Sequence, residues 1–254
     1  MNKVFFNLLN AVALSVLLFT VGCSDNGGDD PTIVTKENIS AKWAIADANS
    51  LYSSIEFNES GNYIIIKNQA QASELKGVSS DNNADASVLF GTYQIISDNV
   101  IKLNGFGTIT VSSITESSFK FTVKLESSST VKEYISTRNS DIANSSRTDL
   151  LCRTWKITKW DGEDVAGTEK EIGVIFSKAG TYFVFNYSNN GIILGIANWK
   201  WKNSAETILR YEHGEGYDYV DGEIEIVMLN SDKLEFTEDF GPDGISEYVL
   251  VPVI

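Results

Sequence analysis

Histidine is nearly absent from this chain, because His213 is the only one among 254 residues. A Ser-His-Asp triad needs one placed histidine, and an H-E-x-x-H metalloprotease helix needs two. The sequence also lacks the G-x-S-x-G, P-loop and G-x-G-x-x-G motifs. Paired carboxylates can hydrolyse glycosides without histidine, but no signature singles out two of the 34 acidic residues. We therefore expect a protein that is not an enzyme.

Basic residues and cysteines are scarce as well. The 20 Lys and Arg residues face 34 Asp and Glu residues, which gives a net charge of −14. So acidic a chain argues against nucleic acid or anionic membrane surfaces as partners. Two cysteines, Cys23 and Cys152, are too few for a tetracysteine zinc site or a disulfide framework. We expect neither a structural metal nor a cofactor.

The N-terminus has one early charge, Lys3, followed by an apolar run over residues 4–22. A basic start and a short apolar middle are typical of a secretory signal peptide. The alternative, a transmembrane anchor, needs about 20 predominantly apolar residues. Asn7 and Asn10 leave the strictly apolar core too short for that. Residues 1–22 are therefore predicted to be a signal peptide.

The string LFTVGC at residues 18–23 resembles the lipobox of bacterial lipoproteins. The resemblance implies cleavage before Cys23 and attachment of fatty acyl chains such as palmitate to it, which leaves Cys152 without an intramolecular disulfide partner. Residues 23–35 are small and acidic, so we expect a flexible tether. Their start, CSDNGGDD, resembles the export signal of Bacteroidetes surface lipoproteins, which implies a lipid-anchored protein on the outer face of the outer membrane. The alternative is a plain linker.

Apolar residues alternate with polar ones along much of the remaining chain, as in Phe119, Phe121 and Val123. Period two with frequent turn residues predicts an all-β, antiparallel fold. Asp and Asn followed by Gly favour tight hairpin turns, because both residues tolerate positive φ. Three such pairs are Asp161-Gly162, Asn190-Gly191 and Asp221-Gly222.

Two parts of the chain repeat one pattern. IEFNESGNY (residues 55–63) and VIFSKAGTY (residues 174–182) share Phe, Gly and Tyr at the same spacing, 119 residues apart. Apolar positions from Ile109 to Phe121 recur 115 residues later, from Ile224 to Phe236. The preserved order predicts a tandem duplication, with domains at residues 36–138 and 147–254 and a linker at 139–146. Each copy has an ordinary single-domain size, and the first has about eight strand segments, enough to close a small barrel.

The second copy is also similar to the lipocalin-like domains of Bacteroidetes lipoproteins. The resemblance implies two tandem antiparallel lipocalin-like β-barrels, a fold that commonly encloses ligands, behind the signal peptide and tether. The motifs that carry it are Trp155-Lys156, Phe176 with Gly180-x-Tyr182, Trp199-x-Trp201 and Tyr248-x-Leu250.

Aromatic residues are more frequent in the second copy, with 15 against 10 in the first. Trp199 and Trp201 share one strand face, as do Phe183 and Phe185. Trp160 precedes a turn and is expected to be exposed. Such residues either fill a barrel core or form a site for an apolar ligand or a glycan. The candidate ligand-binding residues are Trp160, Phe183, Phe185, Trp199 and Trp201.

His213 lies in an acidic segment with Glu212, Glu215, Asp218 and Asp221. Several carboxylates on one loop can bind a hard cation. No calcium-loop spacing is matched, so we expect a solvated hairpin turn instead. The second copy is nevertheless the more acidic one, with a net charge of −9 against −2 in the first.

The sequence favours a non-enzymatic outer-membrane lipoprotein whose second domain binds a small apolar ligand or a glycan. The alternative is a structural lipoprotein with filled barrels that docks a partner protein at the cell surface.

Overall fold

The structure, a computed structural model, describes residues 33–68, 87–187, 191–213 and 221–253. They belong to one compact unit that runs from Pro31 to Ile254. The signal peptide and all of the tether except residues 33–35 lie outside the described residues. Among the helices that are described, none is long and apolar enough to cross a membrane.

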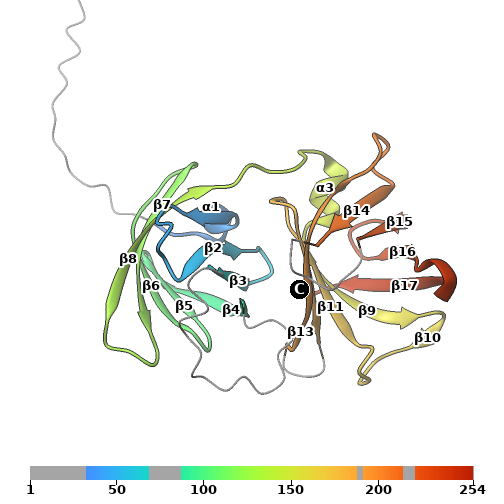
Figure 1. Cartoon of the computed structure of the whole chain (residues 1–254), viewed down its shortest axis with the longest axis horizontal. Helices are drawn as coiled ribbons and strands as arrows, with labels where there is room; N and C mark the ends of the chain where they lie inside the picture. Colours follow the sequence, from blue (N-terminus) through green and yellow to red (C-terminus); the bar gives the residue numbers. More distant parts are fainter. Residues whose placement is uncertain (1–32, 69–86, 188–190, 214–220, 254) are drawn as a thin grey trace, which may run out of the picture. The chain divides into compact units, whose positions relative to one another are not determined.

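The first copy forms a closed antiparallel barrel of eight strands (Figure 1). Successive strands pair with each other, and β1 pairs with β8 to close the barrel. The elements are α1 (Lys36–Ile39), β1 (Lys42–Ile45), β2 (Tyr52–Phe57), β3 (Asn62–Lys67), β4 (Val88–Ser97), β5 (Val100–Leu103), β6 (Gly107–Ile114), β7 (Ser118–Leu125) and β8 (Val131–Arg138).

The second copy repeats this barrel, so the predicted pair of tandem antiparallel barrels is confirmed. Here β9 pairs with both β11 and β17, and the short β10 adds a hairpin to β9. The elements are α3 (Ser146–Leu151), β9 (Thr154–Trp160), β10 (Glu163–Asp164), β11 (Ile172–Phe176), β12 (Thr181–Asn186), β13 (Ile193–Trp201), β14 (Ile208–Glu212), β15 (Gly222–Leu229), β16 (Leu234–Asp239), the 3-10 turn η2 (Gly241–Asp243) and β17 (Ile245–Pro252).

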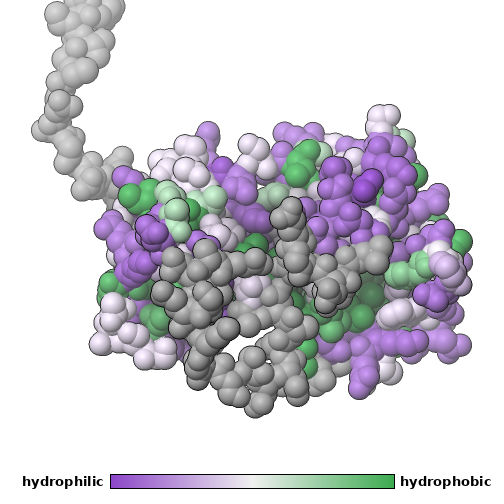
Figure 2. All heavy atoms as spheres, viewed as in Figure 1, coloured by the Kyte–Doolittle hydropathy of each residue, from purple (hydrophilic) through white to green (hydrophobic). Residues whose placement is uncertain are grey.

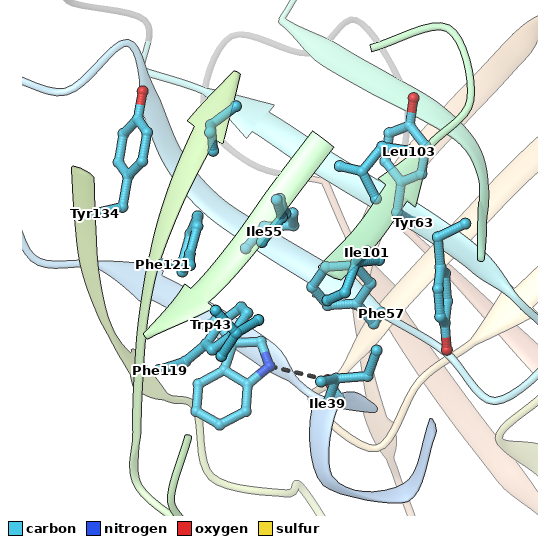
Figure 3. Packing of buried hydrophobic residues seen from close by; sticks show 14 of the residues in the cluster. Ile39, Trp43, Ile55, Phe57, Tyr63, Ile101, Leu103, Phe119, Phe121 and Tyr134 are labelled. Atoms are coloured by element: carbon cyan, nitrogen blue, oxygen red, sulfur yellow. Dashed lines mark hydrogen bonds between the residues drawn. The ribbon is translucent and has the colours of Figure 1, made fainter. Parts of the chain in front are cut away.

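A short helix precedes the first strand of each barrel and is fixed to it by a buried tryptophan. The Trp43 indole N–H donates to the Ile39 carbonyl at 2.9 Å, as Figure 3 shows. The Trp155 indole N–H donates to the Leu151 carbonyl at 2.8 Å. Each bond satisfies one of the carbonyls that a helix leaves free at its C-terminus. This repeated contact explains why the two tryptophans recur in the sequence.

Glycines in the turns follow the repeat in part. Gly61 and Gly180, at the same place in the two copies, have φ of +87° and +84°, so the shared glycine provides a positive φ. Asp161 and Gly162 form the predicted tight turn, with φ of 51° and 82°. The predicted turn at Asp221-Gly222 is wrong, because Gly222 is the first residue of β15 and pairs with Tyr211. Asn190 lies outside the described residues.

Each barrel has its own apolar core. In the first barrel, Trp43, Phe57 and Phe119 are almost fully buried and their rings are in contact (Figure 3). In the second barrel, Trp155, Trp199 and Phe236 occupy the interior. Burying a large apolar side chain contributes about 1.5–3 kcal/mol, so these rings stabilise each barrel from within. The surface visible in Figure 2 is largely hydrophilic, with small apolar patches.

A third apolar cluster joins the two barrels. It contains Ile64 and Val88 of the first barrel and Ile175, Phe183 and Phe185 of the second, with Ile193 and Ile196 beside them. Two polar contacts flank this cluster and follow the same pattern. The first residue of β1 contacts the first residue of β12, and the first residue of β9 contacts the first residue of β3. The Lys42 ammonium donates to the Thr181 hydroxyl at 3.3 Å, and the Thr154 hydroxyl donates to Asn62 Oδ1 at 3.2 Å. Reciprocal contacts of this kind are typical of an isologous, two-fold interface.

Candidate functional site

The two ends of the second barrel differ. At one end, α3 packs on β15 and the Trp201 indole N–H donates to the Thr148 hydroxyl at 2.9 Å. The opposite end, where β13, β15 and β17 begin, is called the mouth below. Strand β13 runs from one end to the other, so the Cα atoms of its first and last residues are about 26 Å apart.

A cavity of about 640 Å³ opens at the mouth. Its walls combine the aromatic rings of Tyr182, Tyr211 and Phe240 with the apolar side chains of Val184 and Leu194. Its rim carries His213 and the carboxylates of Asp221, Asp239 and Asp243. Pockets of about 300–1,000 Å³ with mostly apolar walls and a few polar groups are typical of small-molecule sites.

The mouth of the first barrel is filled instead. Phe106, in the turn before β6, packs against Tyr52 and Tyr63 with ring centroids 5.6 and 6.3 Å apart. The space left among Phe106, Tyr52 and Tyr134 is only about 10 Å³. A single water needs about that much room, so the described residues at this mouth leave no space among them for a larger ligand.

Three corresponding positions account for this difference. The 115-residue offset of the repeat matches Phe106 to Asp221 and Val123 to Glu238. Strand pairing matches Leu103 to Tyr211, because each lies opposite the first glycine of the next strand. The second barrel therefore has Asp, Glu and Tyr where the first has Phe, Val and Leu. The apolar side chains that fill the mouth of the first barrel thus correspond to polar side chains beside the cavity of the second.

Tyr211 and Glu238 form a buried pair beside the cavity. The Tyr211 hydroxyl donates to Glu238 Oε1, and Glu238 is only 8% exposed. Burial raises the pKa of the Glu238 carboxyl, although the hydrogen bond from Tyr211 opposes the shift. Burial, followed by the nearby Glu238 charge, also raises the pKa of Tyr182 well above its usual range. The tyrosine hydroxyls of this wall therefore stay protonated and can donate hydrogen bonds.

Gly222 makes room for this arrangement. A Cβ atom at position 222 would come within 2.1 Å of the Tyr211 hydroxyl oxygen, far inside van der Waals contact. The Tyr211 ring can therefore lie across β15 only because residue 222 has no side chain. The glycine of the mispredicted turn instead positions a residue of the cavity wall.

The rim of the cavity is held by local hydrogen bonds. The His213 backbone N–H donates to Asp221 Oδ1 at 2.9 Å, and the Gly241 N–H donates to Asp239 Oδ1 at 2.8 Å. Arg210 contacts Glu212 at 3.1 Å and Asp221 at 3.9 Å. Within the described residues, no group of three or more His, Cys, Asp and Glu side chains is arranged to hold a metal ion. Glu215 and Asp218, two of the acidic residues considered as possible ligands of a hard cation, lie outside those residues.

Two of the three tryptophans predicted to bind a ligand, Trp199 and Trp201, lie in the core on the α3 side of the cavity, with Trp199 opposite Tyr211 in the strand pairing. Trp199 is 2% exposed, its indole N–H donates to the Ser177 carbonyl at 3.0 Å, and its ring meets that of Trp201 edge-on at 5.4 Å. The two do share a strand face, as expected, and that face points into the core beside α3. Neither lines the cavity.

Phe183 and Phe185 also share a face, but it is the outer face of the second barrel. Phe90 of the first barrel packs against both rings, with centroids 4.7 and 4.6 Å apart. The two residues therefore form part of the contact between the barrels. The alternating residues Tyr182 and Val184 point inward instead and line the cavity.

Trp160 lies at the mouth but is half-buried rather than exposed. Its ring packs on Tyr248 at 5.1 Å, and the Lys170 ammonium lies over it at 4.9 Å. It is not among the residues that line the cavity. The sixth predicted site residue, Cys23, lies outside the described residues. Cys152 is free, and burial raises its pKa, so it stays a thiol at neutral pH.

The residues that do line the cavity were missed at the sequence level. Tyr182 belongs to the sequence repeat, and Asp221 and His213 belong to the acidic segment, but nothing in the sequence pattern places the three residues together. The usable signal was the comparison of the two copies, which shows Phe106 replaced by Asp221 and Val123 by Glu238.

No protein-family model matches this chain, and no curated protein matches its sequence. The resemblances to lipocalin-like domains and to Bacteroidetes surface lipoproteins therefore stay predictions.

Proposed function

We propose that the protein is a non-enzymatic binding protein whose second domain takes a small apolar molecule or a glycan into the cavity at its mouth. One observation carries the proposal. Two barrels of the same fold differ at one end, where the second has about 640 Å³ of space and the first about 10 Å³. A cavity lowers the stability of a fold, because the side chains around it lose packing contacts. The second barrel therefore lacks stabilising contacts that the filled mouth of the first barrel has.

The chemistry of the walls supports a ligand with both apolar and polar groups. The faces of Tyr182, Tyr211 and Phe240 offer surfaces on which a hydrocarbon or a sugar ring can pack. The carboxylates at the rim accept hydrogen bonds from hydroxyl or amine groups. Phe240 is 44% exposed at the rim, so a ligand would cover apolar surface that is now in contact with water.

We further propose that Cys23 carries the lipid anchor and that the protein lies on the cell-surface side of the outer membrane. The lipobox-like sequence, the acidic tether and the apolar leader support this location. Mass spectrometry of the mature N-terminus tests it directly. An unmodified Cys23, or a chain that starts elsewhere, would contradict the anchor without affecting the proposed ligand site.

Calorimetric titration of the full chain against panels of lipids and oligosaccharides tests the ligand site. We expect at least one compound to bind, and Leu194→Trp to abolish that binding by filling the cavity. Val227→Trp is the matched control, because it adds the same indole to an outer position of the same barrel that is 65% exposed. Binding that survives Leu194→Trp would place the ligand elsewhere, and no binding to either panel would count against a ligand of these two classes.

A docking role is the second candidate, and apolar residues on an outer strand favour it. Val131 and Ile135 on β8 are 56% and 49% exposed. If the panels give no ligand, and Val131→Lys with Ile135→Lys removes capture of a cell-surface protein, this role replaces the first.

A further inference from the structure

The cavity of the second barrel is lined by negative charge. Asp221, Asp239 and Asp243 are among the described lining residues, whereas no Lys or Arg is. Among the described lining residues, His213 is the only side chain that can become positively charged. A ligand with a carboxylate or phosphate would meet repulsion at this rim and find no Lys or Arg partner there. Fatty acids and acidic sugars are therefore poor candidates.

The buried carboxylate of Glu238 adds a second observation, independent of the rim. Glu238 is 8% exposed and lies behind Tyr211, which donates a hydrogen bond to it. Among the described residues, no Lys, Arg or His side chain comes within 4.0 Å of it to form an ion pair. A buried carboxylate without a countercharge is costly, and the first barrel has Val123 at this position. An ionisable carboxyl therefore lies next to an open cavity, separated from it by Tyr211.

Arg210 and Lys200, on β14 and β13 of the same barrel, do not supply that countercharge. Arg210 alternates with the inward-facing Leu209 and Tyr211, so it points outward, and it pairs with Glu212 at 3.1 Å. Lys200 pairs with the same Glu212, also at 3.1 Å. Both cations are outside the barrel and already paired. A positive group near Glu238 would have to arrive with the ligand.

The aromatic walls suit a positive group as well. The rings of Tyr182 and Tyr211 lie 5.2 Å apart at a tilt of 42°, and both border the cavity. A cation over the face of such a ring is attracted by about 0.5–2 kcal/mol. We infer that the ligand of the second barrel is an organic cation, a protonated or quaternary amine on an apolar body, with the amine against the rings of Tyr182 and Tyr211, in front of the buried Glu238 carboxyl. This inference rests on the proposed function, because it names the ligand class of that same cavity.

Three compounds with one indole body separate the ligand classes in calorimetric titrations of the full chain. Tryptamine carries an amine, tryptophol a hydroxyl and indoleacetate a carboxylate. We expect tryptamine to bind at least about tenfold more tightly than tryptophol, and indoleacetate most weakly. The preference should shrink about tenfold in Glu238→Gln and also in Asp239→Asn, whose exposed side chain keeps an oxygen to accept the Gly241 hydrogen bond. Asp232→Asn is the control, since it removes one charge from an exposed turn at the opposite end.

The outcomes separate this inference from the proposed function. Equal affinity for tryptamine and tryptophol would overturn the cation inference and leave the cavity as a ligand site. So would tighter binding of indoleacetate, or binding of a lipid or oligosaccharide from the panels with none of the three indoles bound. If no compound of either kind binds, both are wrong. A preference for tryptamine that Asp232→Asn reduces as much as Glu238→Gln would show only the net charge of the domain, and would also overturn the inference.

Discussion

Thr181 of the second barrel donates its hydroxyl hydrogen to Glu56 of the first barrel, at 2.7 Å. Both residues are nearly buried, with 1% and 3% of their surface exposed. The other carboxylate oxygen, Glu56 Oε1, has no hydrogen-bond partner among the described residues and borders a cavity of about 50 Å³. The contact between the barrels thus contains a buried carboxylate that accepts a hydrogen bond from a hydroxyl of the other barrel.

Thr181→Val should therefore destabilise the protein. The change keeps the shape of the side chain but leaves Glu56 Oε2 without its donor, which costs roughly 1–3 kcal/mol for a buried acceptor. Urea denaturation measures the loss in the free energy of unfolding. Thr110→Val makes the same replacement at an exposed position of β6 and should change it by less than about 0.5 kcal/mol. Equal effects of the two variants would contradict a structural role for the hydroxyl.

Trp199→Ala is expected to act on stability. The indole fills the core beside α3 and its N–H is bonded to the Ser177 carbonyl, so its removal should cost about 3–5 kcal/mol. Thermal unfolding followed by circular dichroism measures this. A variant that unfolds at the wild-type temperature and has lost ligand binding would show instead that Trp199 belongs to the ligand site.

The Glu238 carboxyl makes stability depend on pH in a defined direction. Its pKa is raised in the folded state, chiefly by burial among Tyr182, Tyr211 and Tyr248. A raised pKa means that the protonated carboxyl stabilises the fold at low pH, and that this contribution is lost as the pH rises through the folded-state pKa. Glu238→Gln, which cannot ionise, should gain stability over the wild type as the pH increases from 4 to about 8.

Urea denaturation of both proteins across that range checks the direction. Glu225→Gln is the control, because Glu225 lies on the outer face of β15 and is exposed. A difference between Glu238→Gln and the wild type that does not vary with pH, or that favours the wild type at high pH, would contradict the burial of an ionisable carboxyl at this site.

Much of the fold could be predicted from the sequence because the side chains of a barrel strand point alternately inward and outward. Alternating apolar residues such as Phe119 and Phe121 predict strands, and a repeat of about a hundred residues with eight segments predicts a closed barrel. The repeated Trp43 and Trp155 have the same bonded role in both copies. Because the sequence is duplicated, the same barrel could be predicted for both copies.

The site could not be predicted the same way. Period two shows that Phe183 and Phe185 share a face, but it does not say that the first barrel covers that face. It likewise places Trp199 and Trp201 together without indicating that α3 closes their end of the barrel. Whether a mouth is open depends on the residue just before one strand, Phe106 before β6 or Asp221 before β15, and on side chains from other strands that only the closed sheet brings together.

The most direct test makes the second barrel carry the residues of the first. The variant Tyr211→Leu, Asp221→Phe and Glu238→Val replaces the polar wall of the cavity by the plug of its sister copy. Calorimetric titration of this full-length variant with a compound that binds the wild type should give no binding, while its unfolding temperature stays the same or rises because a buried carboxylate is gone. Wild-type affinity in a variant that is folded would contradict the central claim that the mouth of the second barrel is the ligand site.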